Sequence, residues 1–176
     1  MKPLKINIVL FGIGNLGSAI INQIVETQQA ILEEKKIEIR FPVITNSTLA
    51  FFENEYKKNK WDADFTKASG RFTVQNIIDY VQEEELENLI VIDATKSSEL
   101  LNFYPLLIQN GFNLIAFNEK VQQQESFLYS KLKNDLKKED KRYLNAKVKS
   151  KITTKILLEY IFKAVDPWVL NQREAG

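Results

Sequence analysis

Residues 9–20, VLFGIGNLGSAI, constrain the fold more than any other part of the chain. A run of β-branched and apolar residues leads into Gly12, Gly14 and Gly17, and an apolar pattern at helical spacing follows. A buried strand that ends in such a loop and continues directly into a helix is typical of the first unit of an α/β fold. Half of the chain's six glycines lie in this loop, which argues against an ordinary glycine turn.

Each glycine of a G-x-G-x-x-G loop has a physical role. The first permits a tight turn, the second lets the backbone approach a pyrophosphate, and the third lets the helix pack close to the sheet. The exposed amides at the helix N-terminus then face the anion. We therefore predict a dinucleotide site, for NAD or NADP, at Gly12, Gly14, Asn15, Leu16 and Gly17. The alternative is a glycine turn in the same fold that binds nothing.

Strand-like and helix-like segments alternate along the chain. Strands are expected at residues 5–11, 36–47, 89–95, 112–120 (with its exit loop) and 143–148, helices at 15–34, 48–56, 72–81, 97–111, 125–141 and 152–165, and a polar loop at 57–70. Pro42 inside the second strand requires a bulge or a missing ladder bond, and Asn110-Gly111 supplies a left-handed helix end. The alternation predicts an α/β, Rossmann-like, doubly wound and mostly parallel sheet with helices on both faces, plus a C-terminal helix.

We divide the chain into a nucleotide-binding domain, residues 1–148, and a C-terminal helix with its tail, residues 149–176. In the helix expected at 152–165, the charged residues are Lys155, Glu159 and Lys163, and most of the other positions are apolar. The helix therefore has a wide apolar surface. This surface packs on the domain's own sheet, or forms an interface with a second copy or another chain, and both can hold at once. Trp168, Val169 and Leu170 would extend it.

The composition excludes several kinds of chemistry. The chain has no cysteine and no histidine, so it has no thiolate nucleophile, no imidazole base and none of the usual zinc ligand sets. We therefore expect no metal site. A net charge of +1 and interleaved acids in KLKNDLKKEDKR argue against nucleic-acid binding. No apolar run is long enough to span a bilayer, so we expect a cytoplasmic, non-membrane protein.

The end of the second strand bears on the choice of cofactor. NAD-binding loops usually place Asp or Glu there, about twenty residues after the glycines, to hold the ribose hydroxyls. This chain has ITNST instead, with neither an acid nor an arginine. Asn46 and Ser47 can bind a ribose or a phosphate, but they do not choose between NAD and NADP.

Five segments together extend the argument beyond the glycine loop: FGIGNLGSAI, IEIRFPVITNS, KWDADF, VIDATKSS and LIQNGFNLIAFNEK. In order and spacing they resemble the nucleotide-binding domain of homoserine dehydrogenase over roughly residues 5–143. The resemblance implies reduction of aspartate semialdehyde to homoserine with NAD(P)H. It also implies that Asp93, Thr95 and Ser97 border the cofactor and that Asn118 lies near the nicotinamide. Asp93, Thr95 and Ser97 have an alternative role as caps of the following helix.

The chain departs from the family at the reacting end of the site. The family has a lysine directly after the asparagine, and this chain has Glu119 there, followed by Lys120. A carboxylate in that place would oppose a developing alkoxide. Adjacent residues of an extended segment point to opposite sides, so we expect Lys120 to replace the lysine only if the loop shifts. Glu119 and Lys120 remain the catalytic candidates.

The second departure is at the C-terminal end, where NAKVKSKITTK replaces the family's glycine-rich entry into a substrate domain, and no counterpart of that domain follows. We expect the isolated chain to bind NAD(P) without catalysing the family's reaction. Two alternatives stay open. One is a non-catalytic regulatory or interaction protein that uses the fold as a scaffold, and the other is an enzyme whose substrate domain is supplied separately.

Overall fold

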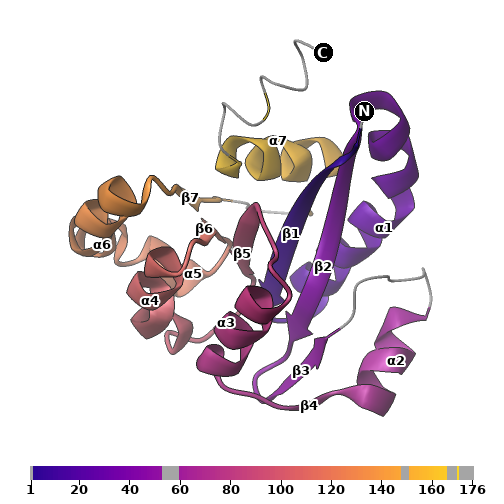
Figure 1. Cartoon of the computed structure of the whole chain (residues 1–176). Coiled ribbons are helices and arrows are strands. Elements are labelled where there is room, and N and C mark those ends of the chain that lie inside the picture. The colour runs from indigo at the N-terminus through magenta and orange to yellow at the C-terminus, as the bar shows by residue number, and fades with distance from the viewer. Residues whose placement is uncertain (1, 53–59, 148–150, 166–169, 171–176) are drawn as a thin grey trace.

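A computed structural model describes residues 2–52, 60–147, 151–165 and 170 of the chain (Figure 1). The expectations for Trp168, Val169 and the segment 53–59 lie outside the described residues. The strands are β1 (Leu4–Phe11), β2 (Ile37–Thr45), β3 (Leu49–Phe52), β4 (Gly70–Arg71), β5 (Leu89–Asp93), β6 (Asn113–Ala116) and β7 (Tyr143–Asn145). The helices are α1 (Asn15–Lys35), α2 (Trp61–Ala68), α3 (Val74–Glu83), α4 (Tyr104–Gln109), α5 (Glu119–Gln122), α6 (Glu125–Glu139) and α7 (Thr154–Ala164), and a 3₁₀ turn (Leu100–Phe103) precedes α4.

The described strands form one mixed sheet in the order β4-β3-β2-β1-β5-β6-β7. Strands β2, β1, β5, β6 and β7 run parallel, whereas β3 and β4 pair antiparallel at one edge. From β1 the chain builds the sheet first toward β2 and later, from β5 onward, toward the other edge. The carboxyl ends of β1 and β5 therefore form the switch point where ligands bind in open α/β sheets. The predicted doubly wound fold is confirmed.

Helices cover both faces of this sheet (Figure 1). One apolar core joins the sheet to α1, α2 and α7, and the other joins it to α3, α4 and α6. Strand β1 supplies both cores in alternation, since Ile6, Ile8 and Leu10 belong to the first and Val9 and Phe11 to the second. Such a strand, apolar on both sides, is typical of a central parallel strand.

The bulge predicted from Pro42 is present in β2. Asn7 of β1 pairs with Arg40, and Val9 pairs with Val43, so two residues of β2 face one residue of β1 between these pairs. The extra residue accommodates the proline, which cannot donate to the ladder.

The prediction of a helix over residues 48–56 was wrong for the described part. Residues 49–52 form β3, which returns antiparallel along β2. The Asn46 side chain makes the turn by accepting hydrogen bonds from the amides of Thr48, at 2.9 Å, and Leu49, at 2.7 Å. The alternation then buries Phe51 in the α1-side core and leaves Phe52 to pack edge-on against Tyr80. Pairing with the open edge of β2 outweighs local helix preference.

The predicted polar loop at 57–70 was also wrong where it is described. Residues 61–68 form α2, and the short strand β4 follows. Trp61 and Phe65 lie one turn apart and both enter the α1-side core, and the Trp61 indole donates a hydrogen bond of 2.8 Å to Asn22 of α1. Two apolar residues at i and i+4 were the signal for this helix.

Three further boundaries differ from those expected. The helix predicted at 97–111 begins only at Leu100, as a 3₁₀ turn, because a side-chain hydrogen bond to the Ser97 carbonyl holds the preceding loop. Gly111, after the end of this helix, has the expected left-handed conformation with φ of 92°. The exit loop after β6 contains α5. Strand β7 ends at Asn145, before the expected residue 148.

Helix α7 packs against the face of the sheet that α1 covers. Leu157, Ile161 and Ala164 are buried in that core. The guanidinium of Arg142 donates hydrogen bonds to the carbonyls of Lys163, at 3.1 Å, and Val165, at 2.8 Å, and so holds the C-terminal end of the helix. Among the described helices, none is both long enough and apolar enough to cross a bilayer.

Candidate functional site

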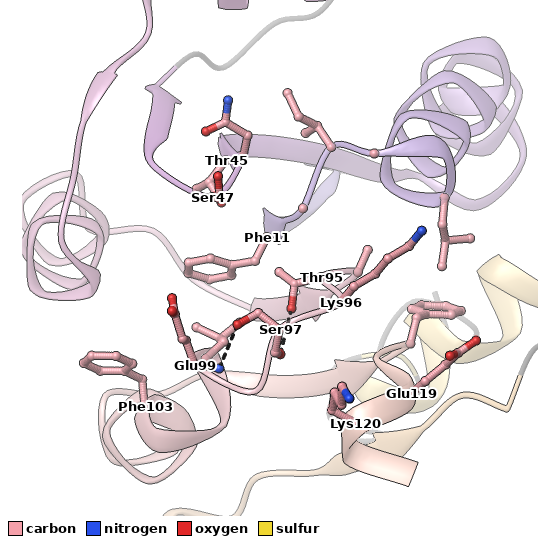
Figure 2. A pocket seen from close by; sticks show the side chains of 18 of the residues that line it. Phe11, Thr45, Ser47, Thr95, Lys96, Ser97, Glu99, Phe103, Glu119 and Lys120 are labelled. Carbon is pink, nitrogen blue, oxygen red and sulfur yellow. Dashed lines mark hydrogen bonds between the residues drawn. The ribbon is translucent and has the colours of Figure 1, made fainter. Parts of the chain in front are cut away.

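A cleft of about 1050 Å³ lies at the carboxyl ends of β1, β2 and β5. Its walls are the loops that leave these three strands, together with the start of α1, the start of α3 and α5. Figure 2 shows the loop carrying Thr95, Lys96 and Ser97 facing the loops after β1 and β2. The cleft therefore sits at the switch point of the sheet, and its volume is at the upper end of the range for small-molecule and cofactor sites.

Two of the three glycines are required by close backbone contacts. Gly12 has φ of 95°, and a Cβ there would lie 2.8 Å from the carbonyl carbon and oxygen of Ala94. A Cβ on Gly17 would lie 1.8 Å from the carbonyl oxygen of Gly12. The loop after β1 is thus in contact with both the loop after β5 and the first turn of α1, and only glycine fits at either position.

Gly14 differs, because a Cβ there would meet no atom within 4 Å. It is the N-cap of α1, no described side chain caps the helix, and its first turn contains no acidic residue. Asn15 and Leu16 line the cleft beside it, whereas Gly17 lies behind the lining. The open space in front of an uncapped N-terminus of a 21-residue helix is where backbone amides and the helix dipole favour an anion.

Asp93, at the end of β5, organises the loop that follows it. Its carboxylate accepts hydrogen bonds from the Thr95 amide at 3.0 Å, the Thr95 hydroxyl at 2.7 Å and the Tyr104 hydroxyl at 2.6 Å. Burial raises the pKa of Asp93 above its ordinary value, and these hydrogen bonds partly offset that rise. Burial and the neighbouring carboxylate raise the pKa of Tyr104 as well.

Asn118, at the end of the β6 segment, ties the same loop to α5. Its Nδ2 donates to the carbonyl of Ser97 at 2.6 Å and to the Thr95 hydroxyl at 3.1 Å, and its Oδ1 accepts from the Lys120 amide at 3.0 Å. Asp93 and Asn118 are almost fully buried and stand behind the lining, while Thr95 and Ser97 belong to it. The four predicted residues are thus brought together as one hydrogen-bonded unit.

The end of β2 contributes the polar residues expected there. Thr45, Asn46 and Ser47 line the cleft. The Asn46 side-chain oxygen accepts hydrogen bonds from the amides of the β2–β3 turn, whereas the Ser47 side chain is exposed at this wall.

An apolar wall of the cleft was missed in the sequence. Phe11 and Phe72 lie with their ring centroids 6.3 Å apart, and Val74, Leu100 and Phe103 continue this wall. Its members come from β1, the start of α3 and the turn before α4, so no local pattern connects them. Glu99, also missed, lines the cleft next to this wall (Figure 2).

The geometry expected at Glu119 and Lys120 requires a correction. These residues are not extended, because they begin α5, whose N-cap is Asn118. Adjacent residues of a helix point about 100° apart rather than to opposite sides, and both Glu119 and Lys120 line the cleft. Lys96 lines it too. No cluster of three or more potential metal ligands occurs among the described residues.

Known proteins with similar sequences and structures share this architecture. The sequence model of the family "Homoserine dehydrogenase, NAD binding domain" matches residues 12–145. A bifunctional aspartokinase/homoserine dehydrogenase of Buchnera aphidicola subsp. Acyrthosiphon pisum is 29% identical over 140 residues, which are 79% of this chain and 17% of that protein.

Solved structures show the same fold. The homoserine dehydrogenase of Thermoplasma acidophilum superposes with a TM-score of 0.59 at 14% identity, over 80% of this chain and 42% of that one. A hyperthermophilic archaeal homoserine dehydrogenase mutant in complex with NADPH superposes with a TM-score of 0.57 at 19% identity, over 81% and 44%. The chain spans less than half the length of these relatives. With the family match over most of its residues, it belongs to the NAD-binding domains of the homoserine dehydrogenase family.

Proposed function

We propose that the cleft binds a nicotinamide dinucleotide, with the pyrophosphate in front of α1. The observation that carries this proposal is the open space at Gly14, combined with the uncapped helix N-terminus behind it. A side chain at position 14 would enter that space. With glycine there, the space in front of the helix N-terminus stays open for a ligand. The amides of Asn15 and Leu16 would bind the pyrophosphate oxygens.

The remaining lining residues fit the two halves of such a ligand. The apolar wall around Phe11 and Phe72 would take the adenine, and Asn46 and Ser47 at the end of β2 would take its ribose. Thr95 and Ser97 would face the nicotinamide half on the other side of the switch point. Asp93 and Asn118 would act from behind the lining, because their hydrogen bonds fix the Thr95–Ser97 loop.

The family's reaction interconverts an aldehyde and a primary alcohol, and this chain holds only part of what it needs. A bound reduced nicotinamide would supply the hydride to the carbonyl carbon, and a proton must reach the carbonyl oxygen. Lys120, at the edge of the cleft, is the group that would donate this proton, with Glu119 beside it opposing negative charge on the oxygen. We propose that the isolated chain binds the cofactor without turning over the substrate.

Calorimetric titration of the folded chain with NADPH and then NADH tests the binding proposal. We expect micromolar affinity for at least one of them and loss of the binding heat in Gly14→Asp, which places a carboxylate where the anion belongs. No heat with either nucleotide, from a chain that is folded by circular dichroism, would refute the proposal. An activity assay of the chain alone, and of the chain mixed with a separately produced substrate domain of a homoserine dehydrogenase, tests the proposal that the isolated chain does not turn over the substrate. Activity of the chain alone would contradict that proposal.

A second candidate function is a scaffold that binds another chain or a second copy. Exposed apolar residues on two helices favour it, since Phe127 and Tyr129 of α6 are 70% and 56% exposed and Ile156 of α7 is 40% exposed. A tight oligomer in analytical ultracentrifugation, together with an empty cleft in the titration above, would favour the scaffold over the dinucleotide site.

A further inference from the structure

We infer that the cleft selects NAD(H) over NADP(H), and that Ser47 and Glu99 decide this preference. The inference rests on the proposed function, because it concerns which group the same cleft binds at the 2′ position of the adenosine ribose. NAD has a hydroxyl there, and NADP has a phosphate with close to two negative charges. The charges around the end of β2 therefore determine which of the two cofactors is accepted.

The 2′ position falls at the end of β2. In a doubly wound sheet the group that reads the adenosine ribose follows the second strand, about twenty residues after the glycines. In this chain that place is occupied by Asn46 and Ser47, and both line the cleft. The aromatic pair Phe11 and Phe72 lies at the same end, as an adenine site requires.

No described positive charge of the lining lies at this end. Lys96 and Lys120 are the cations among the described lining residues. Figure 2 shows the Lys96 side chain extending away from Ser47, toward the start of α1, and Lys120 lying on α5 at the other end of the cleft. Both are therefore placed for the pyrophosphate or the nicotinamide half, not for a 2′-phosphate.

The two arginines nearest in the fold are also directed elsewhere. Arg40 lies within β2 and is bound by the Glu38 carboxylate, with both contacts at 2.7 Å. Arg71 of β4 pairs with Leu49 of β3, and the Leu49 side chain packs against the α1-side core. Phe72, which follows Arg71 in the chain, packs against the core on the other face of the sheet. Cross-strand partners share a face of the sheet, so Arg71 lies on the face opposite the aromatic wall.

Among the described lining residues, the charge that does lie at the adenosine end is negative. Glu99 lines the cleft and is exposed, and Figure 2 shows its carboxylate on the side of Phe11 and Phe103, facing the β2 wall that carries Ser47. A ribose hydroxyl can donate a hydrogen bond to a carboxylate or to a serine oxygen. A 2′-phosphate can only accept from the serine, would meet no cation among the described lining residues at this end, and would be repelled by Glu99.

The experiment compares reduced cofactors and their fragments on the full chain by calorimetry at low salt. NADH and NADPH give the preference, and ADP-ribose with its 2′-phosphorylated form isolates the adenosine end from the nicotinamide. We expect the unphosphorylated ligand to bind at least about tenfold more tightly in each pair, a difference of about 1.4 kcal/mol. Raising the salt concentration should narrow the gap, because screening weakens the repulsion from Glu99.

Two variants and two matched controls locate the cause. Ser47→Arg supplies the missing cation and should bring NADPH affinity to that of NADH or above it. Glu99→Gln should strengthen NADPH binding several-fold while changing NADH binding little. Gln28→Arg on the outer face of α1 and Glu83→Gln at the far end of α3, both exposed, make the same charge changes away from the cleft and should leave the preference unchanged.

The outcomes separate this inference from the proposed function. Equal or tighter binding of NADPH by the unaltered chain would overturn the preference while supporting the dinucleotide site. A preference that persists in Ser47→Arg and in Glu99→Gln would overturn the assignment to these residues. Failure of all four ligands to bind would overturn the proposed function, and the preference with it.

Discussion

Alanine at Gly14 and alanine at Gly17 should both weaken dinucleotide binding, but only the second should destabilise the fold, although only two residues separate them. At Gly17 the new Cβ would lie 1.8 Å from the carbonyl oxygen of Gly12, and this atom belongs to backbone that cannot rotate away. The loop and the helix must separate by at least about an ångström, and overpacking of this kind costs about 1–3 kcal/mol. The same shift displaces the amides of the first turn of α1, so Gly17→Ala should lose both stability and dinucleotide affinity.

Gly14→Ala should lose affinity with little loss of stability. Its φ of −70° is ordinary for alanine, and the new Cβ meets no atom within 4 Å. The expected cost is at most about 1 kcal/mol, from an N-cap position that alanine fills less well than glycine. In the complex, however, the methyl group would occupy the space of the pyrophosphate, and we expect at least a tenfold increase in Kd, about 1.4 kcal/mol.

Urea denaturation gives the free energy of unfolding of each variant, and calorimetry with NADH gives its affinity. Gly70→Ala is the matched control, because a Cβ there also meets no atom within 4 Å and Gly70 does not line the cleft. It should leave affinity unchanged. Full NADH affinity in Gly14→Ala would refute the pyrophosphate position, and wild-type stability in Gly17→Ala would refute the steric argument.

Four further predictions concern the supports of the site and of the sheet. Tyr104→Phe removes a donor to the buried Asp93 carboxylate, so it should lower the free energy of unfolding by about 1–3 kcal/mol and raise the pKa of Asp93 further in a carboxyl NMR titration; an unchanged titration would contradict the assigned contact. The pKa of the Asp93 carboxyl is raised above its ordinary value of 3.8 in the folded chain, so the folded state favours the protonated form. The contribution of Asp93 to the free energy of unfolding should therefore fall as the pH rises from 3.8 through the raised pKa. Urea denaturation across this pH range should show that slope in the unaltered chain and not in Asp93→Asn. Arg142→Met should lower the free energy of unfolding by about 1–2 kcal/mol and increase amide exchange in the last turn of α7, whose carbonyls Arg142 binds; unchanged exchange there would count against this role. The buried side-chain amide of Asn145 has no hydrogen-bond partner among the described residues, so Asn145→Leu should raise the free energy of unfolding by about 1 kcal/mol in urea denaturation, and a decrease would show that the amide is satisfied.

The parts of the fold that local pattern determines were predictable from the sequence. The apolar run before Gly12 and the periodic residues after it define β1 and α1, and the two-sided apolar run at 89–93 defines a central parallel strand. An irregularity at Pro42, either a bulge or a missing ladder bond, followed from the missing donor, and the structure has the bulge. In each case the nearest neighbours in sequence set the structure.

The errors share a cause, since distant parts of the chain decide those segments. Residues 49–52 form a strand because β2 offers an open edge, and α2 forms because Trp61 finds the core beneath α1. The orientation of Lys120 depends on the Asn118 side chain that caps α5. Local periodicity carries no information about such partners.

The glycine loop and several polar lining residues of the candidate site were predictable from the sequence, but its aromatic wall was not. The glycine loop is local, so Gly12, Gly14 and the start of α1 could be placed from the sequence. Asp93 and Asn118 meet across 25 residues of sequence, and their shared hydrogen bonds put them behind the lining instead of in it. The aromatic wall and Glu99 are assembled from separate elements, which only the folded chain brings together.

Amide NMR of the ¹⁵N-labelled chain during titration with NADH tests the central claim most directly, because it reports binding and its location together. We expect saturable shifts at Gly12, Gly14, Asn15, Leu16 and Thr95, with small changes along α6 and α7. Absence of shifts at saturating NADH, or shifts confined to residues away from the carboxyl ends of β1, β2 and β5, would contradict it.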